Sequence, residues 1–396
     1  MTTSISRLLM ITERFAPDLG GVARSAERTA LALARLGIEV HVLAWTKTLD
    51  PGMLDQETIE PDATQGSVAV HRLGLFSNMD FSMQHTLNVL EWLHGEYQFQ
   101  AVWGHYVYPA GYMAVLFAEW AKVTSTVSAR GNDIDRLMFP PGDFARLTWT
   151  LDRATAISAV SRDLSHKVGV LLSRDSQAIV IPNAVDLEVF SRQEADAALR
   201  DSLGIAADEA VLGFCGELRH KKGLPFLLNA LTEVRQSREA CLLIIGEVRP
   251  REQSHLSAYA AEHPDDAARI IVTERIDDRS QVARHLNLCD VFLQPSVWDG
   301  LPNAVLEAMA CKRIVITSDA GGIAEAVESG VSGFVIPKAM LHRLGTAIGE
   351  VLDLPVEQRQ EMQAAARRAV EDAYHADREG DALRIVLERL SANSSS

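Results

Sequence analysis

A short apolar run followed by three chain breakers most constrains how this chain can fold. Val291–Gln294 has the length of a buried strand, and Pro295, Gly300 and Pro302 follow it in quick succession. Proline suits a first helical turn because its missing N–H would have no intrahelical acceptor there. We therefore predict a strand, a turn, and a helix that begins at Pro302 or Asn303.

Two carboxylates flank this turn. Asp299 lies within it, and Glu307 lies about one turn into the expected helix. Open α/β sheets bind ligands at the carboxyl ends of their strands, where free amides at a helix start attract phosphates or sugar hydroxyls. Two acids beside such amides could hold vicinal hydroxyls. An ordinary strand–helix connection with two solvated acids fits the same spacing, and spacing alone leaves both interpretations open.

Size and charge limit the class of protein. The length of 396 residues predicts two domains, and the apolar fraction of 47% is typical of a folded globular protein. The formal net charge of −15 argues against nucleic acid as a partner, and an anionic substrate would need a local basic pocket. The scattered cysteines and the lack of a long apolar run predict a cytoplasmic protein, with peripheral membrane contact left open.

Strand-length apolar runs alternate with helical stretches along the whole chain. The first half has such runs at 7–11, 40–43, 68–71, 101–104, 124–128 and 156–160, and a second series starts at Ile179. This alternation predicts α/β domains with doubly wound, mostly parallel sheets.

Polar loops follow several of the expected strands in the first half. Gly20 and Gly21 would let backbone amides approach a ligand, although a plain glycine turn explains them equally. His105 and Arg130 each follow a strand, but a lone histidine there is more often structural. The Asp-Ile-Asp run at 133–135 resembles a metal-binding DxD triplet that an acidic chain produces by chance, so we assign no metal site.

A basic cluster lies at a strand end in the second half. Leu218–Gly223 reads LRHKKG before a leucine-striped helix. Arg219 and Lys222 are the best candidates to bind a diphosphate, since a sheltered charge-assisted hydrogen bond contributes about 1.5–3 kcal/mol. A solvated charge run is the alternative. Arg275 lies in a later polar loop of the kind that frames a base.

Taken together, these motifs resemble the retaining GT-B glycosyltransferases of family four, which use nucleotide-sugar donors. The resemblance covers nearly the whole chain, and its most specific part is the DGLPNAVLEAMA run from Asp299. Four weaker motifs keep their order: PDLGGV from Pro17, IPNAVD from Ile181, LRHKKG from Leu218 and SDAGG from Ser318.

The resemblance implies a GT-B α/β fold of two Rossmann-like, doubly wound domains that face each other across a cleft. The N-terminal domain, at 1–178, would bind the acceptor, and the C-terminal domain, at 179–372, would bind the donor. The last helix, about 373–396, would pack back on the first domain.

The resemblance also implies residue roles. Glu307 would hold the donor ribose, and Lys222 with Arg219 would neutralise the leaving diphosphate. Asp299 would hold the transferred sugar, and Arg275 would contribute to the donor site. The amides around the helix start would join Asp299, at Gly300, Leu301, Pro302 and Asn303. The first domain would contribute Gly20 and Gly21, with His105, Arg130, Asn132 and Asp133 as acceptor-side candidates.

By resemblance, a positive charge that stabilises the leaving group matters more to this reaction than a nucleophilic side chain. The anomeric carbon becomes oxocarbenium-like as the nucleoside diphosphate leaves, so stabilising that anion carries much of the catalysis. By resemblance the reaction retains configuration through same-face attack, without a metal or a separate cofactor. A hexose-type sugar would pass from a nucleoside diphosphate, UDP or GDP, to a hydroxyl of a small-molecule, glycan or lipid-linked acceptor.

Three departures from the family pattern leave alternatives open. Asp299 is one methylene shorter than the usual glutamate, Glu217 stands where arginine is usual, and Arg130 replaces a sugar-facing histidine. Arg130 could instead meet an acidic acceptor or a phosphate. The alternatives are another GT-B activity, such as a nucleotide-sugar epimerase or an inverting transferase, and a catalytically silent nucleotide-binding subunit.

Overall fold

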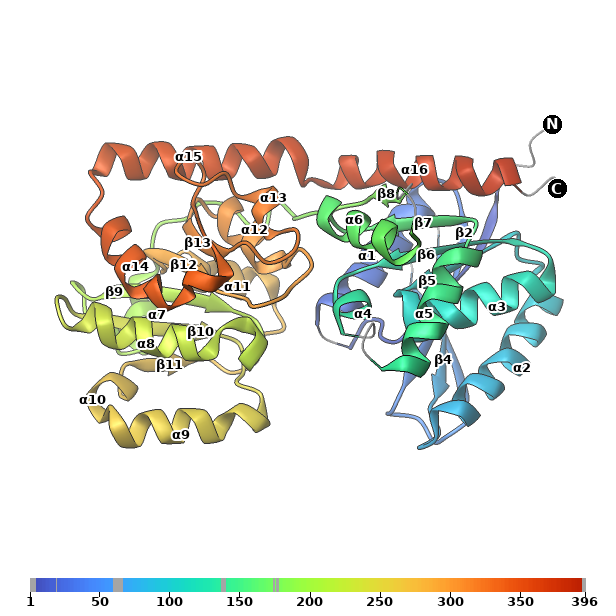
Figure 1. The fold of residues 1–396 in the computed structure, drawn as a ribbon, viewed down its shortest axis with the longest axis horizontal. Coiled ribbons are helices and arrows are strands. Elements are labelled where there is room, and N and C mark those ends of the chain that lie inside the picture. The colour runs from blue at the N-terminus through green and yellow to red at the C-terminus, as the bar shows by residue number, and fades with distance from the viewer. Residues whose placement is uncertain are drawn as a thin grey trace. The chain divides into compact units, whose positions relative to one another are not determined.

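Two compact units make up the structure, a computed structural model that describes residues 5–18, 20–59, 67–136, 140–173, 175 and 178–393. Unit 1 comprises Met1–Asn183 and Asp377–Ser396, and unit 2 comprises Ala184–Ala376 (Figure 1). Among the helices in the described ranges, none is long and apolar enough to cross a membrane.

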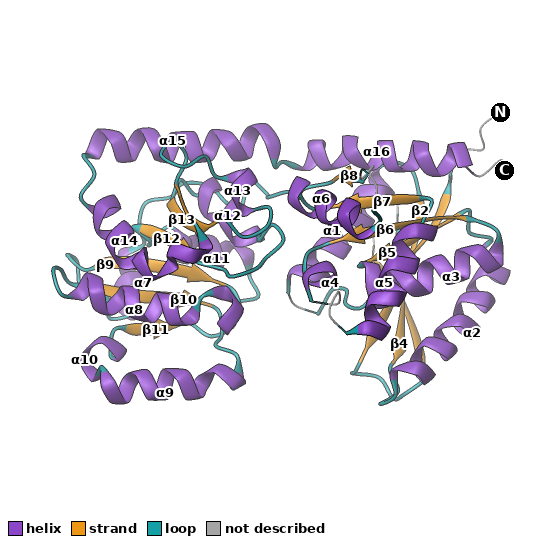
Figure 2. Ribbon diagram, in the orientation of Figure 1, coloured by secondary structure: helices purple, strands orange, loops and turns teal. Residues whose placement is uncertain are grey.

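Unit 1 is built on a sheet of eight strands in the order β3-β4-β2-β1-β5-β6-β7-β8. Neighbouring strands run parallel except β3 and β4, which are antiparallel. The strands are β1 (Arg7–Thr12), β2 (Glu39–Thr46), β3 (Leu54–Ile59), β4 (Val68–Gly74), β5 (Ala101–His105), β6 (Thr124–Ala129), β7 (Ala156–Ala159) and β8 (Ile179–Val180). The inner strands are apolar along their length because both faces of a parallel sheet are covered, and Figure 2 shows helices packed around these strands.

The helices of unit 1 include one from the far end of the chain. They are α1 (Gly21–Arg35), α2 (Met79–Tyr97), η1 (Val107–Gly111), α3 (Tyr112–Ala121), α4 (Asn132–Asp135), α5 (Pro141–Arg153), α6 (Arg162–Leu171) and α16 (Ala376–Asn393). Leu383, Val386 and Leu390 form a buried stripe on α16, and they share a core with Leu8 of β1 and Ala26 of α1. The C-terminal helix is therefore part of the hydrophobic core of unit 1.

Unit 2 is built on six parallel strands in the order β11-β10-β9-β12-β13-β14. The strands are β9 (Ala210–Cys215), β10 (Ala240–Ile245), β11 (Ile270–Val272), β12 (Val291–Gln294), β13 (Ile314–Ser318) and β14 (Phe334–Ile336). The helices are α7 (Ala197–Ser202), η2 (His220–Lys222), α8 (Leu224–Arg235), η3 (Pro250–Glu252), α9 (Gln253–Glu262), α10 (Pro264–Ala267), α11 (Arg279–Leu286), α12 (Asn303–Ala310), α13 (Ile323–Ala326), η4 (Lys338–Arg343), α14 (Leu344–Leu352) and α15 (Val356–Ala373). The predicted architecture of two α/β domains with parallel sheets is confirmed.

Two elements differ from the sequence-based expectation. The edge strand β3 was not expected, because its sequence LDQETI is largely solvent-exposed and lacks the apolar run used to find strands. The segment from Ile179, expected to open the second domain, instead forms β8 and pairs with β7 at the edge of the first sheet. Pairing with β7, which precedes it in the chain, therefore places this segment in the first sheet.

Candidate active site

The predicted turn lies between β12 and α12 at the carboxyl edge of the second sheet. Pro302 caps α12, whose first residue is Asn303, as the sequence predicted. Neighbouring loops hold the turn from two sides: the Val297 N–H donates to the Lys221 carbonyl and the Gly322 N–H to the Gly300 carbonyl, both at 2.8 Å. The loops after β9, β12 and β13 thus meet at one place.

Two glycines allow these loops to approach so closely. Gly223 has φ +90°, and a Cβ there would lie 2.2 Å from the Pro295 carbonyl oxygen. Gly321 has φ +54°, and its Cβ would lie 2.0 Å from the Asp299 carbonyl oxygen. Both positions combine a left-handed backbone with a backbone contact that leaves no room for a side chain. The glycines of the LRHKKG and SDAGG motifs are therefore required by packing.

Lys222 and Asp299 form an ion pair at this meeting point. The pair is largely sheltered, with 20% of the lysine side chain and 14% of the aspartate side chain exposed. The Ser296 hydroxyl donates to Asp299 Oδ2 at 3.2 Å, and the Gly300 N–H donates to Oδ1 at 3.1 Å. Burial by itself would raise the pKa of Asp299, but the charges of Lys222 and Lys221 outweigh it and hold that pKa below its usual value.

A chain of hydrogen bonds between buried polar groups holds Asp299 in place. Gln294 at the end of β12 donates to the Ser296 hydroxyl at 2.8 Å, and the Ser318 hydroxyl at the end of β13 donates to the Ser296 carbonyl at 2.5 Å. All three side chains are buried. Sequence reasoning assigned no role to Gln294 and Ser296, although both lie at the end of the strand that led to Asp299.

Within the described residues, Arg219 does not join Lys222 at the Asp299 carboxylate. Its guanidinium is paired with Glu217, which also lies 3.5 Å from Arg249 Nε. Glu217 occupies the position where the family pattern has arginine, so this acid offsets part of the positive charge after β9. Lys222 is therefore the main cation that faces the α12 turn.

The other residues predicted to bind the donor differ in how far they are exposed. Glu307 is 4% exposed on α12, and Leu301 is 5% exposed. Asn303 begins α12, where the first amides have no intrahelical acceptor. Arg275 pairs with Asp277 at 2.9 Å, with 54% of its side chain exposed.

In unit 1, the glycine pair lies at the start of α1. Gly20 precedes the helix with φ +113°, a conformation that favours glycine, and a Cβ at Gly20 or Gly21 would meet no atom within 4 Å. Among the described residues, space is therefore left beside both glycines, and their proposed contact with a ligand stays a prediction. Leu19, between the two halves of the PDLGGV motif, lies outside the described residues.

His105 is buried at the end of β5. Its Nε2 lies 2.8 Å from the Ser25 hydroxyl on α1. Burial, then the positive charges of Arg130 and Arg28, hold the pKa of His105 well below its usual range. The ring is therefore neutral at physiological pH, and its hydrogen bond with Ser25 connects the end of β5 to α1.

Arg130 and Arg28 converge on one amide in the same unit. Both donate to Asn183 Oδ1, Arg28 at 3.0 Å and Arg130 at 2.5 Å. Arg28 also pairs with buried Glu379 of α16 at 2.7 Å. Burial, followed by repulsion from Arg28, lowers the pKa of Arg130 to about 10, so Arg130 remains charged at neutral pH. Sequence reasoning missed Arg28, which lies inside the apolar pattern of α1.

Asp133 organises the loop after β6. Its carboxylate accepts the N–H groups of Val107 at 3.0 Å, Arg130 at 3.0 Å and Gly131 at 2.8 Å, and burial raises its pKa to about 6. Asn132 is partly exposed beside it at the start of α4. The other acid of the triplet, Asp135, pairs with Lys167 at 2.8 Å. Both acids of the DxD-like run therefore have protein partners.

Family models match each half of the chain. Residues 20–184 match the model described as a glycosyl transferase 4-like domain, and residues 209–353 match the model described as glycosyl transferases group 1.

Curated relatives match at about one residue in four. D-inositol 3-phosphate glycosyltransferase of Kineococcus radiotolerans is 25% identical over 93% of this chain and 92% of its own length. Alpha-maltose-1-phosphate synthase of Mycobacterium tuberculosis is 24% identical over 96% of this chain and 99% of its own. TuaC of Bacillus subtilis, named for teichuronic acid biosynthesis, is 26% identical, but the match spans 55% of this chain and only 53% of TuaC.

Solved structures share the fold over nearly the full chain. Sucrose-phosphate synthase from Thermosynechococcus elongatus aligns with a TM-score of 0.80 at 17% identity, covering 98% of this chain and 99% of that one. Anabaena Alr3699/HepE, solved with UDP and glucose, aligns with a TM-score of 0.77 at 17% identity, covering 97% of this chain and 99% of that one. Likeness at this identity establishes the shared two-domain fold.

Proposed function

The chain belongs to the GT-B glycosyltransferases of the group 1 and family-four type, and from this membership we propose that it transfers a hexose-type sugar from a nucleoside-diphosphate sugar to a hydroxyl acceptor with retention of configuration. The observation that carries the proposal is the sheltered Lys222–Asp299 pair beside the start of α12. A fixed cation and free helix amides at one edge of the sheet suit a departing diphosphate.

Lys222 would carry most of the stabilisation of the leaving group. Lys222 pairs with Asp299 of the α12 turn, whereas Arg219 pairs with Glu217 of its own loop, so the ammonium of Lys222 is the better placed charge for the diphosphate. Asp299 would orient that ammonium and accept a hydrogen bond from a sugar hydroxyl. Because the cation is supplied by a side chain and the leaving phosphate serves as base, this same-face reaction requires neither a metal nor a carboxylate nucleophile.

We propose that the second unit binds the donor and that UDP is the first nucleotide to test, with GDP second. Anabaena Alr3699/HepE, which shares the fold, has been solved with UDP and with UDP-glucose. The buried Glu307 would accept hydrogen bonds from the ribose. Glu307→Ala should then weaken UDP binding about tenfold or more by removing a charged acceptor. Calorimetric titration measures this, and an unchanged UDP affinity would remove Glu307 from the donor site.

For the acceptor, we propose a hydroxyl compound with a phosphate or carboxylate group, bound by unit 1. Arg28 and Arg130 support this because both guanidinium groups donate to one neutral amide oxygen, with the Glu379 carboxylate paired to Arg28 and the charge of Asp133 near Arg130. One relative is named D-inositol 3-phosphate glycosyltransferase, a name that includes a phosphate compound. We place the reaction in the cytoplasm, where nucleotide sugars are available, and glycan or lipid-linked acceptors remain within this proposal.

A donor panel tests the proposed reaction directly. UDP- and GDP-sugars are incubated with mixed acceptors, products are identified by mass spectrometry, and the anomeric configuration of the product is read by NMR. We expect a new glycoside with the configuration of the donor. An inverted product would identify an inverting transferase, a free epimerised sugar an epimerase, and nucleotide binding without donor hydrolysis or transfer a silent subunit.

A further inference from the structure

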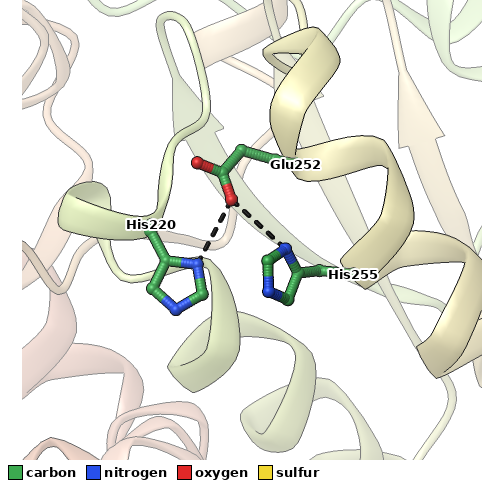
Figure 3. A group of neighbouring side chains, drawn as sticks. All are labelled: His220, Glu252 and His255. Carbon is green, nitrogen blue, oxygen red and sulfur yellow. Dashed lines mark hydrogen bonds and ion pairs between the residues drawn. The ribbon is translucent and has the colours of Figure 1, made fainter.

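A cluster of two histidines and one glutamate lies next to the Lys222 segment on unit 2 (Figure 3). His220 is the first residue of η2, Glu252 is the last residue of η3, and His255 lies in the first turn of α9. Glu252 Oε2 lies 3.2 Å from His220 Nδ1 and 3.4 Å from His255 Nδ1. Figure 3 shows both rings turning a nitrogen toward this one oxygen.

The spacing of these atoms suits a tetrahedral metal ion. Zinc bonds of about 2.0–2.1 Å place two ligand atoms about 3.3–3.4 Å apart, close to both separations in the cluster. The three candidate ligand atoms all lie within 4.8 Å of one another, and this is the one such group within the ranges the structure describes. A small movement of the rings would bring the three atoms around a common centre.

The donor set selects the class of ion. Two imidazole nitrogens and one carboxylate suit Zn²⁺, Co²⁺ or Ni²⁺, whereas Mg²⁺ and Ca²⁺ prefer oxygen ligands throughout. The carboxylate is well sheltered at 12% exposure, while His220 and His255 are 56% and 50% exposed. An ion there would be reachable from solvent, and water would complete its coordination.

Two of the neighbouring positive charges are already balanced by carboxylates. Arg219 is paired with Glu217, and Lys222 is paired with Asp299, so both of these cations already have a counter-charge. Glu252 supplies a carboxylate within the cluster and also accepts the backbone N–H of His220. Two surface hydrogen bonds between histidine and glutamate are the competing explanation, but each would contribute at most about 1 kcal/mol.

We propose that His220, Glu252 and His255 bind one divalent transition-metal ion of the Zn²⁺ class. The bound ion joins η2 to α9, and because η2 ends at Lys222 it restrains the backbone that carries this lysine. This metal site is separate from the chemistry of sugar transfer, and its existence does not depend on the proposed function.

Metal titration of the full chain tests the site. Metal-free protein is titrated with ZnCl₂ by calorimetry, and CoCl₂ binding is followed by the visible absorption of tetrahedral Co²⁺. We expect one ion per chain, no comparable binding of MgCl₂, and affinity lower by on the order of 10- to 100-fold in both His220→Ala and His255→Ala. His342→Ala removes an exposed histidine of the same unit and should bind Zn²⁺ like the unaltered protein.

Hydrogen exchange gives a second readout that does not involve activity. Zn²⁺ should slow amide exchange across residues 219–224 in the unaltered protein and in His342→Ala, but not in His255→Ala. The proposal is overturned by an absence of stoichiometric Zn²⁺ binding, or by Zn²⁺ binding that persists unchanged in both histidine variants. Circular dichroism of the metal-free variants separates loss of ligand from loss of fold.

Discussion

Lys222 has two functions in the proposed site, as a cation for the diphosphate and as the partner of Asp299. Removing its side chain therefore changes both chemistry and stability. Lys222→Ala should lower kcat on the order of 10²- to 10³-fold, the usual cost of losing one group that stabilises a developing anion. Donor turnover at saturating substrate measures the loss, and Lys338→Ala, an exposed lysine of the same unit, serves as the matched control.

A double variant separates the two functions. Lys222→Ala leaves the sheltered Asp299 carboxylate without its ion-pair partner, which is destabilising. Adding Asp299→Asn removes that charge, so the melting temperature should recover while turnover stays low. Recovery of turnover together with stability would mean that Lys222 acts only on the fold.

Glu13 makes the stability of unit 1 depend on pH. Burial, then the neighbouring charge of Asp133, raises the pKa of Glu13 from its usual 4.5 to about 7. The folded state therefore holds a proton that the unfolded state releases, and stability falls as pH rises from about 4.5 to about 7. Below this window the stabilisation is complete, and above it the stabilisation is lost.

Glu13→Gln should abolish this part of the pH dependence. The variant keeps the shape of the side chain without the ionisation, so it should be more stable than the unaltered protein above pH 7, since 7 is the raised pKa. Denaturation measured at a series of pH values tests the expectation. Glu91→Gln, an exposed residue of α2, reports the effect of losing one surface charge. Equal pH profiles for Glu13→Gln and the unaltered protein would contradict the assignment.

At the scale of elements, the site depends on how closely three loops pack. Gly223 connects η2 to α8 and lies against the Pro295 carbonyl, so its missing side chain sets the distance between the β9 and β12 loops. The Lys222–Asp299 pair joins the same two loops. The geometry of the Lys222–Asp299 pair thus depends on Gly223, which has no functional group.

Gly223→Ala should destabilise the protein by about 1–3 kcal/mol, because the left-handed backbone and the contact with Pro295 both oppose a Cβ. Turnover should fall as well, since η2 must move. Gly349→Ala is the matched control: Gly349 lies within α14 and a Cβ there meets nothing within 4 Å. That substitution should stabilise by about 0.5–1 kcal/mol, as alanine does inside a helix. Chemical denaturation of both variants measures the contrast.

At the scale of the whole molecule, unit 1 requires residues from both ends of the chain. Leu383, Val386 and Leu390 of α16 are fully buried against strands and helices that precede them by hundreds of residues. The ion pair between partly buried Arg28 and buried Glu379 also holds this helix against α1. The first unit is therefore incomplete until its last helix is in place.

Leu390→Ala should destabilise unit 1 by about 2–5 kcal/mol through lost burial and the cavity left behind. Ile385→Ala changes a residue of the same helix that is 50% exposed, and it should alter stability by no more than about 0.5 kcal/mol. Hydrogen exchange of β1 and α1 is the suitable measurement, because a two-unit protein need not unfold in a single step. Equal protection in the two variants would show that α16 is not needed by the core.

Local sequence patterns are sufficient to predict the main strands and helices of this chain. Inner strands such as β1 and β12 are continuous apolar runs because both faces of the sheet are covered, and α12 begins where Pro302 allows it. The exposed edge strand β3 lacks such a run, so no local pattern could reveal it. The family motifs predicted functional loops after β9, β12 and β13, and these three loops meet at one edge of the second sheet.

Which side chains meet depends on the three-dimensional fold. Lys222 and Asp299 are 77 residues apart, and Arg28 and Glu379 are 351 apart, so their pairing depends on strand order and helix docking. Arg219 was expected beside Lys222, yet it pairs with Glu217. His220, Glu252 and His255 come from three separate elements. Local sequence sets backbone preference and burial, whereas ion pairs and ligand clusters are set by distances across the fold.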